Sequence, residues 1–193
     1  KLVLEPERIT GNLLFNADES DYAQLAKPLD IGASSHTVEL WVWVPQVGTY
    51  GLDPNERVGT ILGNYDAHPN AVWEILGDGR LRVWWNSNTT NPNSPEINVA
   101  GTRDLRDGQW HHLAFVRDKA ANQYRAYIDD VLDLTANTAG TNIDFSTVAA
   151  PRIGLNTNGS TPFHGLMDEL RVWDKALEDD GFVVAESHAI LRY

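Results

Sequence analysis

The sequence of 193 residues contains no cysteine, which excludes disulfide bonds and thiolate metal sites. Long apolar runs are also absent, since no stretch approaches the roughly 18 to 20 apolar residues of a membrane-spanning helix. We therefore expect no membrane insertion. The chain opens without a methionine or a signal peptide, and we expect it to be an excised domain or a mature fragment.

Basic residues are scarce. The chain carries 15 Lys and Arg against 27 Asp and Glu, for a formal net charge of −12 at pH 7. Nucleic acids and anionic membrane surfaces are polyanions, so this balance argues against both as partners. An acidic chain suits calcium, cationic partners, neutral sugars or simply solubility. The seven tryptophans give it an aromatic content above average.

Catalytic motifs are missing as well. The sequence has no G-x-S-x-G nucleophile turn and no H-E-x-x-H motif. No single strand carries a pair of carboxylates at the spacing that a glycosidase would use. We therefore predict that the chain is not an enzyme. An enzyme that gathers carboxylates from separate strands, such as Glu39, Glu74 and Asp129, stays open as an alternative.

Short apolar runs of strand length are what the sequence does contain, separated by clusters of Gly, Asn, Asp and Pro that favour turns. Residues 36–44 alternate Val and Leu with Glu and Trp, and residues 71–85 are typical of a hairpin with a two-residue turn at Asp78–Gly79. Residues 174–191 are the one segment typical of a helix. We predict an all-β fold, a two-sheet antiparallel β-sandwich or jelly roll with a short C-terminal helix, as a single domain over residues 1–193.

Residues 163–177, FHGLMDELRVWDKAL, place two carboxylates inside an apolar run. As a strand, this segment would put Asp168 on the same face as Leu170, without a partner, while Glu169 would have Arg171 as a same-face neighbour. Burying a lone carboxylate costs several kcal/mol. A catalytic acid, a metal ligand, or neutralisation by protonation, a buried Arg or backbone amides would each explain it, and so would a misread pattern, in which the segment does not follow strict strand alternation. We favour the metal ligand.

An early loop, FNADESDY, offers oxygen ligands suited to calcium. It contains Asn16, Asp18, Glu19 and Asp21 within a few residues. Calcium binds several oxygen atoms from carboxylates, amides and backbone carbonyls. This loop lacks the spacing of a helix–loop–helix site, so a distant residue would have to complete the coordination. A carboxylate on a late strand, such as Asp168, is the kind of residue required.

Several segments resemble the laminin-G-like, concanavalin A-like jelly-roll domains. These are DGQWHHLAFVRD followed by YRAYIDD, RIGLN followed by FHGLMDELRVWDKALEDD, and NLLFNADESDYAQLA, which match the family patterns in the expected order from about Leu13 to Leu177. The resemblance implies two curved antiparallel sheets. It also implies a structural calcium ion between the early loop and the late strand, with Asn16, Asp18 and Asp168 as ligands.

Two positions depart from the family pattern. Ala17 replaces the Gly that usually follows Asn16, which leaves the geometry of the early loop open. Asp129–Asp130 replaces the usual D-G pair, so that turn needs either another shape or a left-handed Asp. The E-x-D-x-x-E strand of laminarinase-type glycosidases is absent, which again disfavours an enzyme.

Polar and aromatic loops favour a carbohydrate ligand. Aromatic rings stack on the apolar faces of sugars, and Asn and Asp side chains suit vicinal hydroxyl groups. Because each strand of a sandwich turns only one face to the core, some tryptophans of the Trp41–Trp43 and Trp84–Trp85 segments must face outward. We further expect Asp66 to hold a second calcium ion at the rim. The predicted ligand-binding residues are Asn64, Tyr65, Asp66, His68, Trp84, Trp85, Asn86, Asn88, Asn156 and Asn158.

The sequence thus predicts a non-catalytic, calcium-stabilised, lectin-like module that binds a glycan or polysaccharide. We expect it to belong to an extracellular adhesin or to a multidomain polysaccharide-active protein. The alternative is an adhesion domain whose partner is a cell-surface protein; a glycan-active hydrolase or lyase and a structural spacer are further alternatives. A polar groove would favour the glycan, and an apolar patch at the rim would favour the protein.

Overall fold

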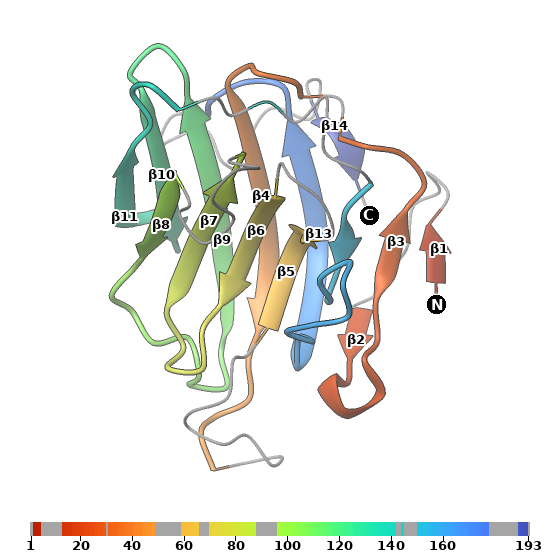
Figure 1. Cartoon of the computed structure of the whole chain (residues 1–193). Helices are drawn as coiled ribbons and strands as arrows, with labels where there is room; N and C mark the ends of the chain where they lie inside the picture. Colours follow the sequence, from red (N-terminus) through yellow and green to blue (C-terminus); the bar gives the residue numbers. More distant parts are fainter. Residues whose placement is uncertain are drawn as a thin grey trace.

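The computed structural model describes residues 2–4, 13–29, 31–48, 59–65, 70–87, 96–141, 144, 150–177 and 189–192. This part of the chain forms two seven-stranded sheets, stacked face to face in Figure 1 with sheet A in front. Sheet A contains, in spatial order, β1 (Leu2–Leu4), β3 (Ala23–Leu25), β12 (Arg152–Ile153), β5 (Gly59–Asn64), β6 (Asn70–Ile75), β7 (Leu81–Asn86) and β8 (Ile97–Ala100). Sheet B contains β11 (Val131–Asn137), β10 (Gln123–Ile128), β9 (Trp110–Asp118), β4 (His36–Trp43), β13 (Gly165–Trp173) and β14 (Ala189–Arg192), with β2 (Leu13–Phe15) paired to β13. A 3-10 helix, η1 (Ala17–Glu19), follows β2.

The core lies between the two sheets because alternate residues of each strand face inward. On β4 the inward residues Val38, Leu40 and Val42 are fully buried, and they belong to the same core cluster as Ala71 and Trp73 of β6. The paired strands are antiparallel except β1 and β3, which run parallel. The prediction of an all-β, two-sheet antiparallel sandwich is confirmed.

The C-terminal helix predicted for residues 174–191 is wrong wherever the structure describes this segment. Residues 174–177 form no helix, and Ala189–Arg192 form strand β14, in which Leu191 pairs with Val172 of β13. A short apolar run fits either kind of element, and pairing with an available sheet edge decides for the strand here. Residues 178–188 lie outside the described residues.

The two-residue turn predicted at Asp78–Gly79 is wrong, and of the two alternatives for the turn at Asp129–Asp130 the left-handed aspartates are observed. The Asp78–Gly79 hairpin joins β6 to β7, but its loop spans residues 76–80, and only Gly79 has a positive φ angle, 83°. The two-residue turn instead joins β10 to β11, where Asp129 and Asp130 have φ angles of 50° and 63°. A type I′ turn needs positive φ at both residues, so this turn keeps its shape with two left-handed aspartates.

A β-bulge in β13 determines which way Asp168 points. After Asp168 the register with β4 shifts by one residue, and Glu169 has a left-handed φ angle of 51°. The extra residue changes which side chains face inward, so Met167 and Leu170 are both core residues. Asp168 pairs with Trp41 of β4 on the outer face of sheet B. The prediction that Asp168 shares the apolar face with Leu170 is therefore wrong.

A chain of hydrogen bonds is buried between the sheets. The Nε1 of Trp73 donates to the hydroxyl of Tyr124 over 2.8 Å, and this hydroxyl lies 3.1 Å from the Nε2 of His36. The Nδ1 of His36 lies 3.3 Å from the carbonyl oxygen of Ser34, which can only accept, so Nδ1 carries the proton and Nε2 accepts from Tyr124. Burial lowers the pKa of His36 to about 3. The hydrogen bond to the backbone of Ser34 raises this pKa, and the positive charge of Arg117 lowers it further.

We predict that the protein loses stability as the pH falls below about 6.5. Unfolded His36 takes up a proton near the ordinary histidine pKa of 6.5, whereas the native residue stays neutral down to about pH 3. The unfolded state therefore binds more protons in this window, which lowers the free energy of unfolding by up to about 1.4 kcal/mol per pH unit. Urea denaturation between pH 5 and pH 8 measures this slope. His36→Gln should have a lower free energy of unfolding, and that free energy should depend less on pH in this range. An unchanged slope would contradict the assignment.

Candidate functional site

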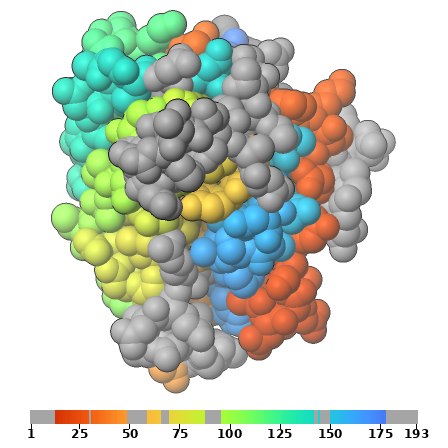
Figure 2. All heavy atoms as spheres, viewed as in Figure 1, coloured from red at the N-terminus to blue at the C-terminus, as the bar shows by residue number. Residues whose placement is uncertain are grey.

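A pocket of about 290 Å³ opens on the outer face of sheet A. Strands β6 and β7 form its floor, and the ends of β5 and of the segment after β12 form its walls. Figure 2 shows the blue atoms of this later segment against the gold atoms of β5. The lining residues are Tyr65, Val72, Glu74, Arg82, Trp84, Asn156, Ser160 and Thr161. We call this site the Tyr65 pocket.

Strand alternation places the floor residues in the pocket. Trp73 of β6 faces the core, so its neighbours Val72 and Glu74 face outward. On β7 the outward residues are Arg82 and Trp84. The register pairs Val72 with Trp84 and Glu74 with Arg82 across the two strands. An apolar pair and a charged pair therefore lie side by side on the floor.

An aromatic stack forms one wall of the pocket. The ring of Tyr65 lies over that of Trp84, with the centroids 4.9 Å apart and the planes tilted by 33°. Tyr65 is 40% exposed and Trp84 is 7% exposed, so Tyr65 presents the accessible aromatic surface. The backbone N–H of Tyr65 donates to the Oγ1 of Thr157 over 2.9 Å, and this hydroxyl donates to Asn64 over 3.0 Å. These bonds tie the tyrosine to the wall opposite.

The polar part of the pocket carries charges that cancel. Glu74 is buried and forms an ion pair with Arg82, whose side chain is 19% exposed. Beside this pair, the side-chain nitrogen of Asn156 donates to the hydroxyl of Thr161 over 2.7 Å, and that hydroxyl lies 2.7 Å from the hydroxyl of Thr60. Removing one partner of a buried ion pair costs about 3 to 5 kcal/mol, so the Glu74–Arg82 pair is held together firmly. The pocket offers donors and acceptors without a net charge.

Several predicted ligand-binding residues meet at this pocket. Tyr65, Trp84 and Asn156 line it. Asn64 is buried next to it, where it accepts the hydrogen bond from Thr157. Asn158 is exposed in the turn that follows, where its side-chain oxygen accepts from the backbone of Ser160 over 2.9 Å and shapes the turn. These residues come from segments about 90 positions apart in the sequence, brought together by the pairing of β5 with β12.

Two predicted residues need correction. Trp85 follows Trp84 on the same strand and therefore faces the opposite way, into the core, where it is 2% exposed. Asn86 is fully buried at the end of β7. Neither offers a surface to a ligand. The remaining predicted ligand-binding residues lie outside the described part of the chain: Asp66, His68 and Asn88.

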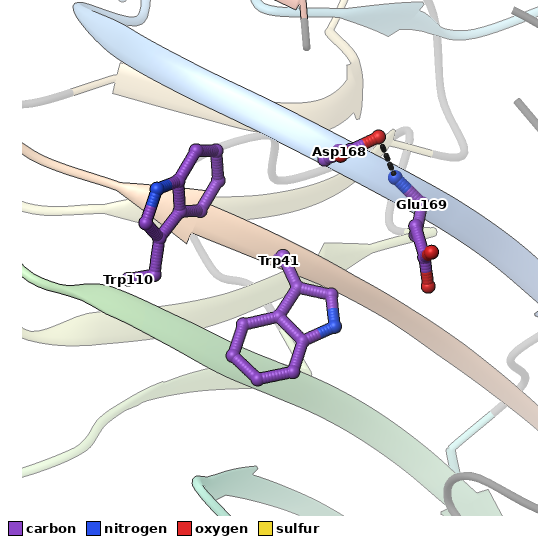
Figure 3. A pocket seen from close by; sticks show the side chains of 4 residues that line it. All are labelled: Trp41, Trp110, Asp168 and Glu169. Atoms are coloured by element: carbon purple, nitrogen blue, oxygen red, sulfur yellow. Dashed lines mark hydrogen bonds between the residues drawn. The ribbon is translucent and has the colours of Figure 1, made fainter. Parts of the chain in front are cut away.

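A second pocket, of about 380 Å³, lies on the outer face of sheet B. It is lined by Trp41, Trp110, Asp168 and Glu169 (Figure 3), and we call it the Trp41 pocket. Both tryptophans are 37% exposed. The sequence predicted outward-facing tryptophans but assigned no ligand to these two. The alternation along residues 36–44 was the signal for Trp41, because the core side of this strand is entirely Val and Leu.

The predicted calcium ligands Asn16, Asp18 and Asp168 do not form one site. The side-chain oxygen of Asn16 accepts the backbone N–H of Asp18 over 3.1 Å at the start of η1. Phe15 pairs with Gly165, so the early loop adjoins the beginning of β13, while Asp168 lies three residues further along, about 10 Å away. Among the described residues, no three His, Asp or Glu side chains converge as metal ligands would. Asp66 lies outside these residues.

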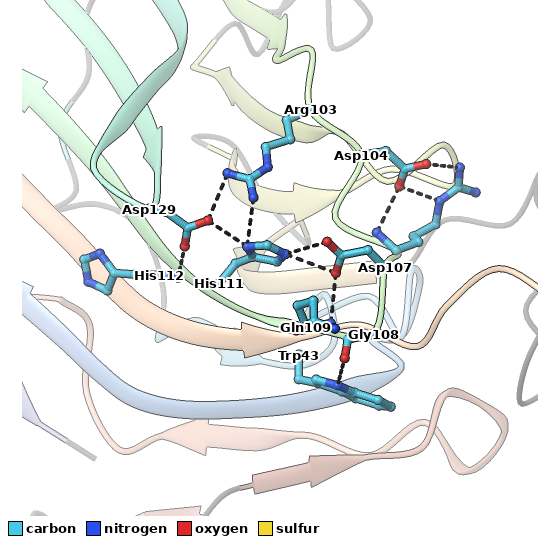
Figure 4. Close-up of polar contacts among 10 residues, drawn as sticks. Trp43, Arg103, Asp104, Asp107, Gly108, Gln109, His111, His112 and Asp129 are labelled. Atoms are coloured by element: carbon cyan, nitrogen blue, oxygen red, sulfur yellow. Dashed lines mark hydrogen bonds and ion pairs between the residues drawn. The ribbon is translucent and has the colours of Figure 1, made fainter.

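Asp129 is held in a network at the β10–β11 turn (Figure 4). Its carboxylate accepts from the backbone N–H of His112 over 3.0 Å, lies 2.8 Å from the Nδ1 of His111 and pairs with Arg103 at 2.9 Å. The other ring nitrogen of His111 lies 3.1 Å from Asp107. Partial burial raises the pKa of Asp129, but the hydrogen bonds from both histidines and the nearby positive charge outweigh this effect and lower the pKa overall. The network fixes the turn to the loop that precedes β9.

The alternative catalytic set is not assembled in this fold. Glu74 lies on the outer face of sheet A, and Glu39 lies on the outer face of sheet B. Glu39 is fully buried there, where it accepts a hydrogen bond from the Nε1 of Trp173 over 3.1 Å. Asp129 belongs to the turn network. The core separates the two glutamates, so these three carboxylates cannot act on one bond.

The chain belongs to the concanavalin A-like lectin/glucanases superfamily, because the family model Laminin_G_3 with this description matches residues 17–181. A comparison with curated protein sequences finds no match. No helix in the described segments is long and apolar enough to cross a membrane.

Solved structures share the fold. Domain 4 of AbnA, a GH43 extracellular arabinanase from Geobacillus stearothermophilus solved with arabinotriose, is 25% identical with a TM-score of 0.56, over 81% of this chain and 68% of that one. A candidate carbohydrate-binding protein from Bacteroides ovatus is 21% identical with a TM-score of 0.63, over 89% of this chain and 48% of that one. Domains LG4-5 of the mouse laminin alpha1 chain are 14% identical with a TM-score of 0.60, over 96% of this chain and 48% of that one. The chain thus spans about half the length of the latter two.

We predict opposite effects for glycine at the two turn positions. Both residues have positive φ angles, but only Asp129 has a carboxylate bound in the network. Asp130→Gly should stabilise the protein by about 0.5 to 1 kcal/mol, because glycine adopts left-handed φ without strain. Asp129→Gly should destabilise it by about 1 to 2 kcal/mol, because the lost hydrogen bonds outweigh the relief. Denaturant unfolding measures both, and the same sign for the two variants would contradict the assignment.

Proposed function

We propose that the chain is a non-catalytic carbohydrate-binding module and that its glycan binds in the Tyr65 pocket. The observation that carries this proposal is the aromatic stack of Tyr65 on Trp84 beside the Glu74–Arg82 pair. A sugar has an apolar C–H face and a hydroxyl edge. An exposed ring next to paired polar groups complements both.

The two halves of the pocket divide the recognition between them. Tyr65, which is 40% exposed, offers the surface on which a sugar ring stacks. Arg82 offers N–H donors to the hydroxyl groups, and the buried Glu74 holds the guanidinium of Arg82 in place through their ion pair. Because the two charges cancel, the pocket favours a neutral ligand over an ionic one. The hydrogen bond to Thr157 holds the backbone of Tyr65, and the stack on Trp84 holds its ring, before the ligand arrives, which reduces the entropy lost on binding.

The comparisons support a carbohydrate ligand. The AbnA domain was solved with arabinotriose, and the Bacteroides ovatus protein is described as carbohydrate binding. The AbnA domain is part of an extracellular enzyme, and we propose an extracellular location for this chain too, within a larger adhesin or polysaccharide-active protein. The separation of Glu39, Glu74 and Asp129 supports a binding role rather than a catalytic one.

Binding of a protein partner is the second candidate. Val131 and Leu132 are 66% and 52% exposed at the start of β11, the edge strand of sheet B. An edge strand has unpaired backbone groups that can extend the sheet into a partner. Val131 and Leu132 are only two neighbouring apolar side chains, whereas the Tyr65 pocket combines an aromatic ring with several polar groups. The pocket therefore favours the glycan.

Titration calorimetry with a panel of neutral oligosaccharides, including arabinotriose, tests the glycan site. Tyr65→Ala should weaken binding about tenfold, equivalent to about 1.4 kcal/mol, because it removes the stacking surface. Tyr65→Phe is the matched control and should bind within about twofold of the parent, because it keeps the ring. Trp110→Ala, on the other sheet, should bind like the parent. Equal affinities of Tyr65→Ala and Tyr65→Phe would refute the site.

Calcium stabilisation stays a separate prediction, which rests on the family resemblance and on the oxygen-rich loop from Asn16 to Asp21. Because Asp168 lies apart from this loop, we predict that Asp168→Ala leaves the difference in melting temperature between calcium and EDTA unchanged. Asp21→Ala should reduce that difference, since Asp21 already accepts the backbone N–H of Asn16 over 3.1 Å and orders the loop. A calcium effect that disappears in Asp168→Ala would show that the strand and the loop do share an ion.

A further inference from the structure

We propose that the Trp41 pocket is a second ligand site and that it binds a sugar residue carrying a protonated primary amine. Two half-exposed indoles, Trp41 and Trp110, and two carboxylates, Asp168 and Glu169, surround a space of about 380 Å³ (Figure 3). This site lies on the outer face of sheet B, whereas the proposed glycan site lies on the outer face of sheet A. The core of the sandwich separates them.

Strand register brings the aromatic and acidic side chains together. Trp41 of β4 pairs with Asp168 of β13 on one side and with His112 of β9 on the other. Directly paired residues have their Cβ atoms about 4.5 to 5.5 Å apart, so Asp168 and Trp41 are immediate neighbours on the same face. The ring of Trp41 leans over His112, with centroids 5.3 Å apart, and Trp110 lies two residues before His112 on β9, where it pairs with Trp43. The lean leaves the space beside Asp168 open.

The bulge at Glu169 leaves one of the two carboxylates without a counter-charge. Glu169 points outward and forms an ion pair with Arg171. Asp168 accepts the backbone N–H of Glu169 over 2.8 Å, and it forms no ion pair within the described part of the chain. One negative charge in the pocket is therefore compensated by an arginine, and the other faces the pocket uncompensated.

The combination of groups defines the ligand. Tryptophan is the side chain whose ring attracts cations most strongly, and its face also stacks on the C–H face of a sugar. Asp168 supplies the negative charge that an ammonium group needs, and the net charge of −12 favours the approach of a cation. A neutral sugar would leave Asp168 without a partner, and a metal ion would make no use of the two indoles. An amino sugar uses all of these groups.

The test compares the trimer of glucosamine with the trimer of N-acetylglucosamine by titration calorimetry at pH 6, where the free amine is protonated. The two ligands share the same backbone and differ in charge. The parent should bind the glucosamine trimer at least tenfold more tightly, and added salt should narrow the difference. Asp168→Asn keeps the acceptor for the Glu169 N–H and should reduce this binding about tenfold. Glu169→Gln should have a smaller effect, because that charge is already paired, and Trp41→Ala should abolish binding.

One further variant, Tyr65→Ala, separates this site from the Tyr65 pocket. Tyr65→Ala should bind the glucosamine trimer like the parent, whatever its effect on neutral glycans. Failure of the Tyr65 site and failure of this one are therefore distinguishable. If Trp41→Ala does not fold, as judged by circular dichroism, Asp168→Asn decides the question alone.

Four results would overturn the proposal. Equal affinity for the two trimers would mean that the amine is not recognised, and unchanged binding in Asp168→Asn would mean that the carboxylate does not recognise it. If neither trimer binds, the Trp41 pocket is not a site for an amino sugar. Nα-acetyl-lysine amide keeps a free side-chain ammonium group. If it binds as tightly as the glucosamine trimer, the occupant is a basic peptide rather than a sugar.

Discussion

Each strand of this sandwich turns only one of its two faces to the core between the sheets, and the binding chemistry of the protein depends on what the strands place on the other face. Strand β4 buries Val38, Leu40 and Val42, and that alternation alone brings Trp41 to the outside. On β7 the same rule separates two adjacent tryptophans, with Trp85 in the core and Trp84 against Tyr65. The apolar core thus determines where aromatic side chains are available to ligands.

The outer face of sheet B is divided into two parts. One part is a second buried cluster, formed by Ala114, Val116, Tyr127, Trp173 and Leu177. At its border the fully buried Glu39 accepts from Trp173 and lies 3.5 Å from Arg171 and 3.4 Å from His112. A carboxylate buried at this border needs these partners, because a buried charge without them is costly. The other part, around Trp41, stays open, and the bulge of β13 directs Asp168 into it.

Much of the fold could be predicted from the sequence because it depends on local pattern. Alternation along residues 36–44 and the turn residues between apolar runs predict an antiparallel sandwich, and the structure confirms it. The bulge at Glu169 could not be predicted, because a left-handed Glu has no signature in composition or spacing. Because of this bulge, Asp168 faces outward rather than sharing a face with Leu170 as strict alternation predicts. The strand β14 was mistaken for a helix because its short apolar run fits both patterns.

The candidate site, too, could be predicted only as far as it depends on local pattern. Aromatic and polar residues of the loops indicated a glycan, and Tyr65, Trp84 and Asn156 do meet in one pocket. Glu74 and Arg82 were missed as a pair. Their alternation with core residues predicts that they face outward, but only the register of β6 against β7 places them opposite each other. Register is set by long-range pairing, which the local pattern of one strand does not contain.

We propose that the two outer faces carry separate sites, with the Tyr65 pocket as the site for a neutral glycan. Recording the indole N–H signals of the seven tryptophans by NMR during titration with a neutral oligosaccharide tests it most directly. We expect the signal of Trp84 to shift while those of Trp41 and Trp110 stay in place. Shifts at Trp41 and Trp110 without one at Trp84 would contradict it.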